Sequence, residues 1–171
     1  MSKISPGCIF CDIVKGAAEV SVCYEDANAL AFMDIQPVNP GHALVVARAH
    51  HESLEELPKA LGEHLFGVAL KLAPVIHKAS HAEGMNLIVS SGAAAGQDVY
   101  HFHIHLIPRK KGDGFDVPLP FGKSDMPDRT MLDAMAARII SALRDPARKR
   151  GIGNRESGIG GRAEGEKKGG K

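Results

Sequence analysis

Three histidines at alternate positions, His101, His103 and His105, are the residues whose types and spacing best suit chemistry. Successive side chains of a β-strand point to opposite faces, so this spacing places the three imidazoles on one face. A helix would instead turn His103 about 160° away from the other two. The intervening apolar side chains are then expected to be buried: Tyr100, Phe102, Ile104 and Leu106. The sequence therefore predicts a strand ending at Pro108, whose imidazole row suits metal binding, nucleophilic attack or acid–base chemistry.

This stretch resembles the signature of the histidine triad (HIT) family, in which three histidines alternate with apolar residues. Residues 101–107 fit that signature at every position. The resemblance includes the lead-in 96–100 and the upstream segments 31–37 and 41–46, and it covers most of residues 8–145. It implies an α+β, HIT-like fold, which is an antiparallel five-stranded sheet with one main helix and a C-terminal helix.

Local patterns predict the elements of such a fold. Four strands are expected before the triad strand, at 20–24, 29–34, 42–47 and 86–90. The last of these is close enough in sequence to pair antiparallel with the triad strand. A helical turn is expected at 53–56 and the C-terminal helix at 128–143. The main helix should begin at Pro58, be perturbed at Pro74 and end at a cap formed by Gly84.

Composition predicts one globular domain, residues 1–145, followed by a basic, glycine-rich tail at 146–171. The tail holds eight Lys and Arg against three Glu, and it has too little apolar surface to offset the entropy of ordering, so we expect it to be disordered. The remaining 13 basic and 17 acidic residues make the body mildly acidic, and no nucleic-acid partner is expected. For the basic tail, a polyanion-binding role is the alternative to a solvated extension without function. No membrane-spanning run or signal peptide is recognisable, so a cytoplasmic location is expected.

The three cysteines do not form a secreted disulfide framework, and the pair Cys8 and Cys11 suits either redox chemistry or half of a zinc site. Cys23 is expected to be a buried, inert thiol. Some bacterial HIT proteins with this N-terminal motif hold a structural zinc. Residue by residue, the resemblance implies the ligands Cys8, Cys11, His50 and His101, with His51 as the competing ligand beside His50. Such a zinc would orient the triad strand, and no organic cofactor is expected.

Neutral imidazole is a good nucleophile, and a phosphorus centre is an electrophile suited to it. The resemblance implies that His103 attacks the α-phosphorus of a nucleotide, forming a nucleotidyl-histidine that water cleaves to a nucleoside monophosphate. It implies that His105 donates a hydrogen bond to the phosphate and that Gln97 contacts the phosphate or the leaving group. His42 matches a fourth active-site histidine.

Asp34 matches the family's acid that binds the ribose hydroxyls, and Phe32 and Ile35 are expected to line the base pocket or to belong to the core. Three residues depart from the patterns of many relatives: Met33 in place of histidine, Ser90 in place of asparagine and Asp98 in place of serine. A carboxylate near a phosphate is repulsive, so Asp98 could instead face a cationic leaving group. These departures leave the reaction intact and the substrate preference open.

The resulting hypothesis is a homodimeric HIT hydrolase that releases AMP from adenosine phosphoramidates or related adenylated compounds, and so binds a purine nucleotide. Dinucleoside polyphosphates are the nearest rival substrates. A second hypothesis is a zinc-stabilised nucleotide-binding or signalling module with vestigial hydrolysis. A third is a hydrolase that uses the histidine row as catalytic metal ligands.

Overall fold

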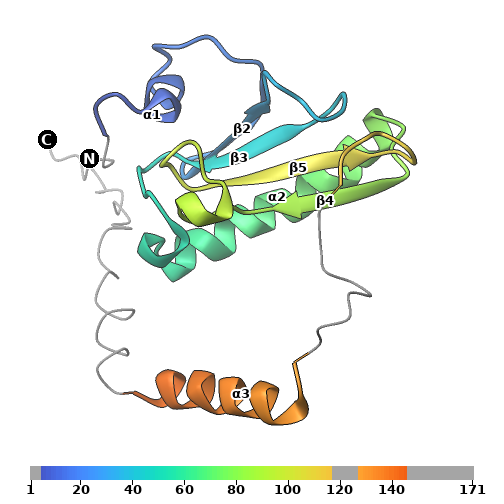
Figure 1. The fold of residues 1–171 in the computed structure, drawn as a ribbon. Helices are drawn as coiled ribbons and strands as arrows, with labels where there is room; N and C mark the ends of the chain where they lie inside the picture. The colour runs from blue at the N-terminus through green and yellow to red at the C-terminus, as the bar shows by residue number, and fades with distance from the viewer. Residues whose placement is uncertain (1–4, 117–126, 146–171) are drawn as a thin grey trace, which may run out of the picture. The chain divides into compact units, whose positions relative to one another are not determined.

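The computed structural model describes residues 5–116 and 127–145, which fall into two compact units (Figure 1). The first unit holds the sheet. Its strands are β1 (Val22–Glu25), β2 (Ala29–Met33), β3 (Ala43–Ala47), β4 (Gly84–Ile88) and β5 (His103–Arg109). Its helices are α1 (Ile9–Val14) and α2 (Lys59–Ala79), with single 3-10 turns η1 (Leu54–Glu56) and η2 (Ala93–Ala95). The helix α3 (Arg129–Arg144) lies in the second unit.

All neighbouring strands pair antiparallel, in the order β1-β2-β3-β5-β4. The predicted α+β fold with a five-stranded antiparallel sheet is confirmed, as is the pairing of β4 with the triad strand. The interior strand β5 is bonded on both sides, with His103 opposite Val46 of β3 and His105 opposite both Leu44 of β3 and Ile88 of β4. His103 and His105 are therefore built into a strand that has hydrogen-bonded neighbours on both sides.

The two faces of the sheet carry two separate apolar clusters. One face packs against α2 through buried residues that include Leu65 on the helix and Phe102 and Ile104 on the triad segment. Helix α1 lies on the other side of the sheet from α2 (Figure 1), and its Phe10 packs there with buried side chains of β2 and β3. Because residues alternate between faces along a strand, His103 and His105 lie on the α1 face. The larger core under α2 thus supports the strand, while the α1 face presents its histidines.

The alternation prediction holds for Phe102, Ile104 and Leu106, which are all buried, but it is wrong for Tyr100, which is 47% exposed. The strand begins only at His103, so Tyr100 precedes the part of the chain where alternation controls burial. Pro108 was expected to end the strand, but it lies inside β5 opposite Met85. Pairing with β3 ends at Leu106, so β5 has one partner strand at Pro108, and proline is tolerated at such edge-like positions.

The helices follow the predictions with local differences. Pro58 is the N-cap of α2 rather than its first residue, and the helix runs on through Pro74. The cap predicted at Gly84 is wrong, because Ser80 ends α2 and Gly84 begins β4. Helix α1, which starts inside the C-x-x-C motif, was not predicted, because six residues are too few for a periodic signal.

The C-terminal helix α3 is confirmed within one residue of its predicted bounds. Asp128 caps it by accepting a hydrogen bond from the Met131 N–H at 2.8 Å. The predicted tail at 146–171 lies outside the described residues. Among the residues that the structure does describe, none of the helices combines the length and hydropathy needed to cross a bilayer.

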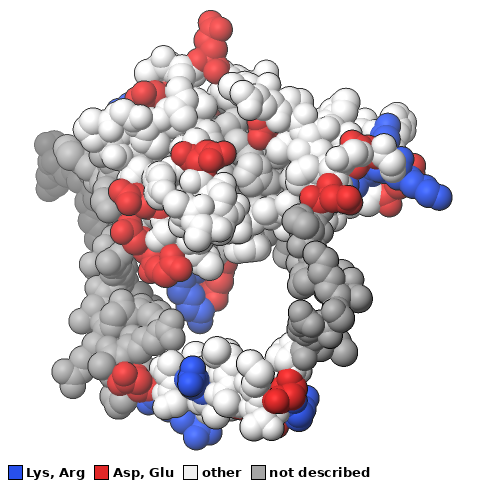
Figure 2. Space-filling model, viewed as in Figure 1, with Lys and Arg blue, Asp and Glu red and all other residues white. Residues whose placement is uncertain are grey.

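Cys23 was predicted to be buried but is exposed, because β1 is an edge strand with β2 as its only strand neighbour. On the face of the first unit seen in Figure 2, acidic side chains are more prominent than basic ones. This agrees with the mildly acidic body inferred from composition.

Candidate active site and metal site

The central histidine, His103, is 6% exposed and held in a single orientation at the start of β5. Its Nδ1 lies 2.7 Å from the backbone carbonyl of His101. A carbonyl oxygen can only accept, so Nδ1 carries the proton and donates it. The remaining nitrogen, Nε2, therefore bears a lone pair. Burial lowers the pKa of His103, so the ring is neutral near pH 7 and Nε2 is free to act as a nucleophile.

His42 and His105 lie beside His103 and are joined by a hydrogen bond whose direction can be assigned. The backbone N–H of Val38 donates to His42 Nδ1 at 3.2 Å, so His42 must carry its proton on Nε2. That nitrogen lies 3.0 Å from Nδ1 of His105, which therefore accepts and keeps its own proton on Nε2. Burial lowers the pKa of both rings, that of His105 to about 4. His105 is thus a neutral imidazole with a fixed Nε2–H donor, 4.8 Å between centroids from His103.

The turn before β3 explains how Val38 reaches His42. The backbone folds back so that the His42 N–H bonds the Asn39 carbonyl at 3.0 Å. Gly41 has φ +97° there, and an added Cβ would lie 3.1 Å from Ser80 and 3.2 Å from Pro108, so any other residue would be both strained and crowded. Asn39 also donates to the Pro108 carbonyl at 2.8 Å, which ties this turn to the triad strand.

Asp34 follows β2 directly and faces the same pair of histidines. One of its oxygens accepts the Gln36 N–H at 2.8 Å, and the other lies 3.5 Å from His42 Nε2 and 4.0 Å from His105 Nδ1. Beside it is an open groove of about 850 Å³, bounded by Ile13, Gly16, residues 18–22 and residues 33–35. The groove is large enough for a nucleoside-sized ligand.

The other residues predicted to bind nucleotide are spread around this region. Ile35 lines the groove and is exposed, whereas Phe32 is buried with its ring against Phe10. Asp98 is exposed and close enough to His103 for its charge to oppose the lowering of that pKa. Ser90 follows β4 and is half-buried.

Gln97 is buried, and its side-chain amide bonds only backbone groups among the contacts of the described chain. Its oxygen accepts the Gly92 N–H at 2.7 Å, and its nitrogen donates to the carbonyls of Glu52 at 2.6 Å and Val99 at 3.0 Å. Through these hydrogen bonds Gln97 links the loop before the triad to the segment that follows β3.

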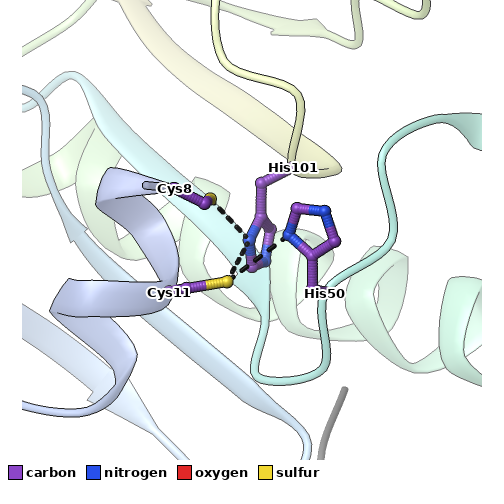
Figure 3. Close-up of side chains that lie close together, drawn as sticks. All are labelled: Cys8, Cys11, His50 and His101. Carbon is purple, nitrogen blue, oxygen red and sulfur yellow. Dashed lines mark hydrogen bonds between the residues drawn. The ribbon is translucent and has the colours of Figure 1, made fainter. Parts of the chain in front are cut away.

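A second cluster brings together Cys8, Cys11, His50 and His101, whose ligand atoms all lie within 4.8 Å of one another (Figure 3). The cysteines project from α1, and the histidines come from the segment after β3 and from the lead-in to β5. The sulfur-to-Nδ1 distances are 3.4, 3.5 and 3.7 Å. Zinc bonds of about 2.3 Å to sulfur and 2.0–2.1 Å to nitrogen in a tetrahedron require separations of about 3.6 Å. The cluster therefore has the dimensions of a zinc site.

The hydrogen bonds of His101 also suit a metal ligand. Its Nε2–H donates to the Ala47 carbonyl at 2.8 Å, which leaves the Nδ1 lone pair directed at the two sulfurs. Burial lowers the pKa of His101 to about 4 and raises that of Cys11, so the His101 ring and the Cys11 thiol are neutral near pH 7, and a bound cation would displace the Cys11 thiol proton. The group contains His50 and not His51, the competing ligand in the sequence prediction.

Asp34, His42 and His105 form a third group with ligand atoms close together, but they suit a metal less well. A metal at His42 Nε2 would require the proton on Nδ1, where the Val38 N–H already points. The criterion is a ring nitrogen whose lone pair faces the other ligand atoms. His101 meets it in the cysteine cluster and His42 does not in the third group, so a catalytic metal among these histidines is disfavoured.

Phe10 was not identified from the sequence as a site residue. Its ring lies edge-on to the imidazoles of His101 and His103, with centroid distances of 5.9 and 5.3 Å. Its position between Cys8 and Cys11 was the one feature of the sequence that could have indicated that Phe10 lies at the site.

Comparison with known proteins agrees with this geometry. Residues 15–112 match the HIT domain. The chain is 34% identical over 143 residues to the adenylylsulfatase HINT3 of Arabidopsis thaliana, covering 84% of this chain and 71% of that protein. The crystal structure of SMU.412c from Streptococcus mutans superposes with a TM-score of 0.78 at 35% identity, covering 84% of this chain and 90% of that one. A zinc-bound histidine triad family protein from Mycobacterium smegmatis matches with a TM-score of 0.62 at 35% identity, over 80% and 97% of the two chains. The chain belongs to the HIT family.

Proposed function

We propose that this protein hydrolyses nucleotides at the α-phosphate through a nucleotidyl-histidine on His103, with adenosine phosphoramidates and other adenylated compounds as substrates. The observation that carries the proposal is the 2.7 Å bond from His103 Nδ1–H to the His101 carbonyl, which leaves Nε2 as a neutral, oriented nucleophile. The relative from Arabidopsis thaliana, named as an adenylylsulfatase, supports an adenylated substrate.

The proposed reaction has two steps. In the first, the Nε2 lone pair of His103 forms a bond to phosphorus, and the bond to the leaving group breaks, releasing an amine that takes up a proton from the solvent. In the second, water attacks the phosphorus and gives up a proton to the solvent, the bond to Nε2 breaks, and the nucleoside monophosphate leaves with the free imidazole restored. The Nε2–H of His105 would donate to a phosphate oxygen in both steps, where charge builds up. Asp34, at the edge of the groove, would bind the ribose hydroxyls.

The test is the hydrolysis of adenosine 5′-phosphoramidate to AMP by the wild-type chain and by His103→Ala. The exposed His77 on α2 provides a matched control, His77→Ala. We expect His103→Ala to lose all turnover and His77→Ala to keep the turnover of the wild type. Acid-sensitive adenylylation of His103 should be trapped by rapid quenching and mass spectrometry. Wild-type turnover of a dinucleoside polyphosphate alone would assign the rival substrate, and binding of AMP without any turnover would support the vestigial module.

We also propose that Cys8, Cys11, His50 and His101 hold a structural zinc. The tetrahedral spacing of their ligand atoms and the zinc-bound relative support this. A bound zinc would supply a covalent link between α1 and the lead-in to β5, and all four ligand positions would be filled by protein, leaving none for water. Removal of the zinc by a chelator should then lower the stability of the fold before it lowers the rate of hydrolysis. This order distinguishes a structural zinc from a catalytic metal.

A homodimer is the third part of the proposal, first suggested by the family resemblance. Strand β4 is at the edge of the sheet, and exposed apolar side chains lie on it and on α2: Leu87, Phe66 and Leu70. An edge strand beside apolar residues is suited to pairing with a second copy. Leu70→Asp should shift the sedimentation coefficient from that of a dimer to that of a monomer, and a wild-type chain that sediments as a monomer would contradict this part.

A further inference from the structure

One atom of the cysteine–histidine cluster lacks a partner. Within the described part of the chain, His50 Nε2 is the buried side-chain nitrogen or oxygen that has no hydrogen bond. The residue is only 4% exposed, and its other ring nitrogen, Nδ1, lies 3.4 Å from Cys11 Sγ. Leaving a buried polar atom unpaired costs about 1–3 kcal/mol, so native structures rarely leave one without a reason.

The nearest suitable group is the carboxylate of Glu52, two residues further along the chain. Its Oε1 lies 3.9 Å from His50 Nε2, which is too long for a hydrogen bond but within reach of a side-chain rotation. The Glu52 side chain is 56% exposed, so its carboxylate stays hydrated and is free to move. The backbone around it is fixed, because the Phe102 N–H donates to the His51 carbonyl and Gln97 donates to the Glu52 carbonyl, both at 2.6 Å.

We infer that Glu52 is the outer acceptor of the metal site, a positioning residue that accepts the Nε2–H of His50 when Nδ1 binds the cation. This inference rests on the structural zinc proposed above. Binding through Nδ1 forces the proton onto Nε2 and makes that N–H a stronger donor, so a nearby carboxylate becomes its natural acceptor. Closing the 3.9 Å gap would fix the tautomer and the orientation of the His50 ring.

The second histidine of the cluster shows why His50 needs such a partner. His101 already has its acceptor, the Ala47 carbonyl at 2.8 Å from Nε2. With Glu52 in place, each histidine ligand has one outer acceptor, a backbone carbonyl for His101 and a carboxylate for His50. Outer acceptors of this kind typically contribute 10–100-fold to metal affinity.

The affinity test uses zinc alone, titrated into the full-length chain in competition with a chromophoric chelator. We expect Glu52→Ala to raise the Kd for zinc by about 10–100-fold, and Glu52→Gln, which retains an acceptor oxygen, to raise it less. Glu63→Ala removes a similarly exposed carboxylate on α2 and should leave the Kd within about twofold of wild type. A Glu52→Ala value within about threefold of the Glu63→Ala value would overturn the inference, as would a wild-type chain that binds no zinc.

A spectroscopic test separates this role from a general loss of stability. In the zinc-loaded wild type, the Nε2–H protons of His50 and His101 should both exchange slowly with water and be visible by imidazole ¹⁵N–¹H NMR. In zinc-loaded Glu52→Ala the His50 signal should be lost, while the His101 signal persists because its carbonyl acceptor is unchanged. Equal loss or equal retention of both signals would contradict the assignment. Neither test measures hydrolysis, so a chain that binds zinc but lacks turnover would overturn the proposed reaction and leave Glu52 in its role.

Discussion

Substitutions of His42 test the hydrogen-bond direction that runs from Val38 through His42 to His105. Asparagine places its amide near the position of Nδ1, where its oxygen can accept the Val38 N–H but nothing reaches His105. Glutamine places its amide near the position of Nε2, where its nitrogen can donate to His105 Nδ1. The pair therefore separates the two contacts, which are 3.2 Å and 3.0 Å long in the wild type.

The expected magnitude follows from what His105 loses. Without a donor at Nδ1 its tautomer is no longer fixed, and a net hydrogen bond of about 1 kcal/mol corresponds to roughly a fivefold change in rate. If the unfixed ring also turns a lone pair toward the phosphate, the loss approaches that of removing one donor from the transition state, about 10²–10³-fold. We therefore expect His42→Asn to lower kcat by between about fivefold and about a hundredfold, and His42→Gln to stay within about fivefold of wild type.

The assay is steady-state hydrolysis of adenosine 5′-phosphoramidate, with kcat and KM measured separately. The effect should fall on kcat, because the His105 donor acts on charge that develops during the reaction. His77→Asn and His77→Gln serve as exposed controls, and thermal unfolding should show that both His42 variants fold. If His42→Asn turns over as fast as His42→Gln or faster, the inferred hydrogen-bond direction is wrong.

Three further predictions concern stability. Leu65→Ala should lower the free energy of unfolding in urea by about 2–5 kcal/mol, because Leu65 is fully buried between α2 and the sheet. A zinc chelator should lower the unfolding temperature of the wild type but not that of Cys11→Ser, because zinc adds stability only where it binds the folded state. Burial raises the pKa of Asp26, but hydrogen bonds from Asn28, Tyr24 and Ala29 outweigh it and lower the pKa to about 2. The carboxylate therefore stabilises the fold above about pH 4, by at most about 2 kcal/mol, and this contribution is lost as the pH falls toward 2. In Asp26→Asn the free energy of unfolding should therefore depend less on pH in that interval.

The sequence predicted the sheet well because its strands alternate or are uniformly apolar, and these patterns report burial directly. It failed where burial is set by neighbours distant in sequence. Cys23 has an apolar environment in the sequence but lies on an edge strand, and Tyr100 continues the alternation of the triad although the strand has not yet begun. Periodicity shows neither where a strand begins nor which strand lies at the edge.

The site shows a similar division. Residue types and the family resemblance predicted the four residues of the cysteine cluster, and the structure brings their ligand atoms together. The role predicted for His103 as the nucleophile stays a prediction. The tautomers could not be predicted, because they depend on backbone groups that carry no sequence signal, such as the Val38 N–H and the Ala47 carbonyl. Glu52 was missed for a related reason, since an exposed glutamate beside a histidine is common and only the buried, unpaired Nε2 gives it a role.

His101 links the two sites because its side chain and its carbonyl serve different ones. The imidazole points to the cysteines, while the carbonyl of the same residue accepts the Nδ1–H of His103, the proposed nucleophile. His101 precedes β5, so the strand pairing of β5 does not fix its backbone. Its position depends instead on the Ala47 bond, on the Val99 carbonyl that its own N–H reaches at 2.8 Å, and on the cysteine cluster. A metal bound there would therefore hold the one backbone carbonyl that keeps the nucleophilic nitrogen unprotonated, which gives a closed structural site a positional role in catalysis without any contact with substrate.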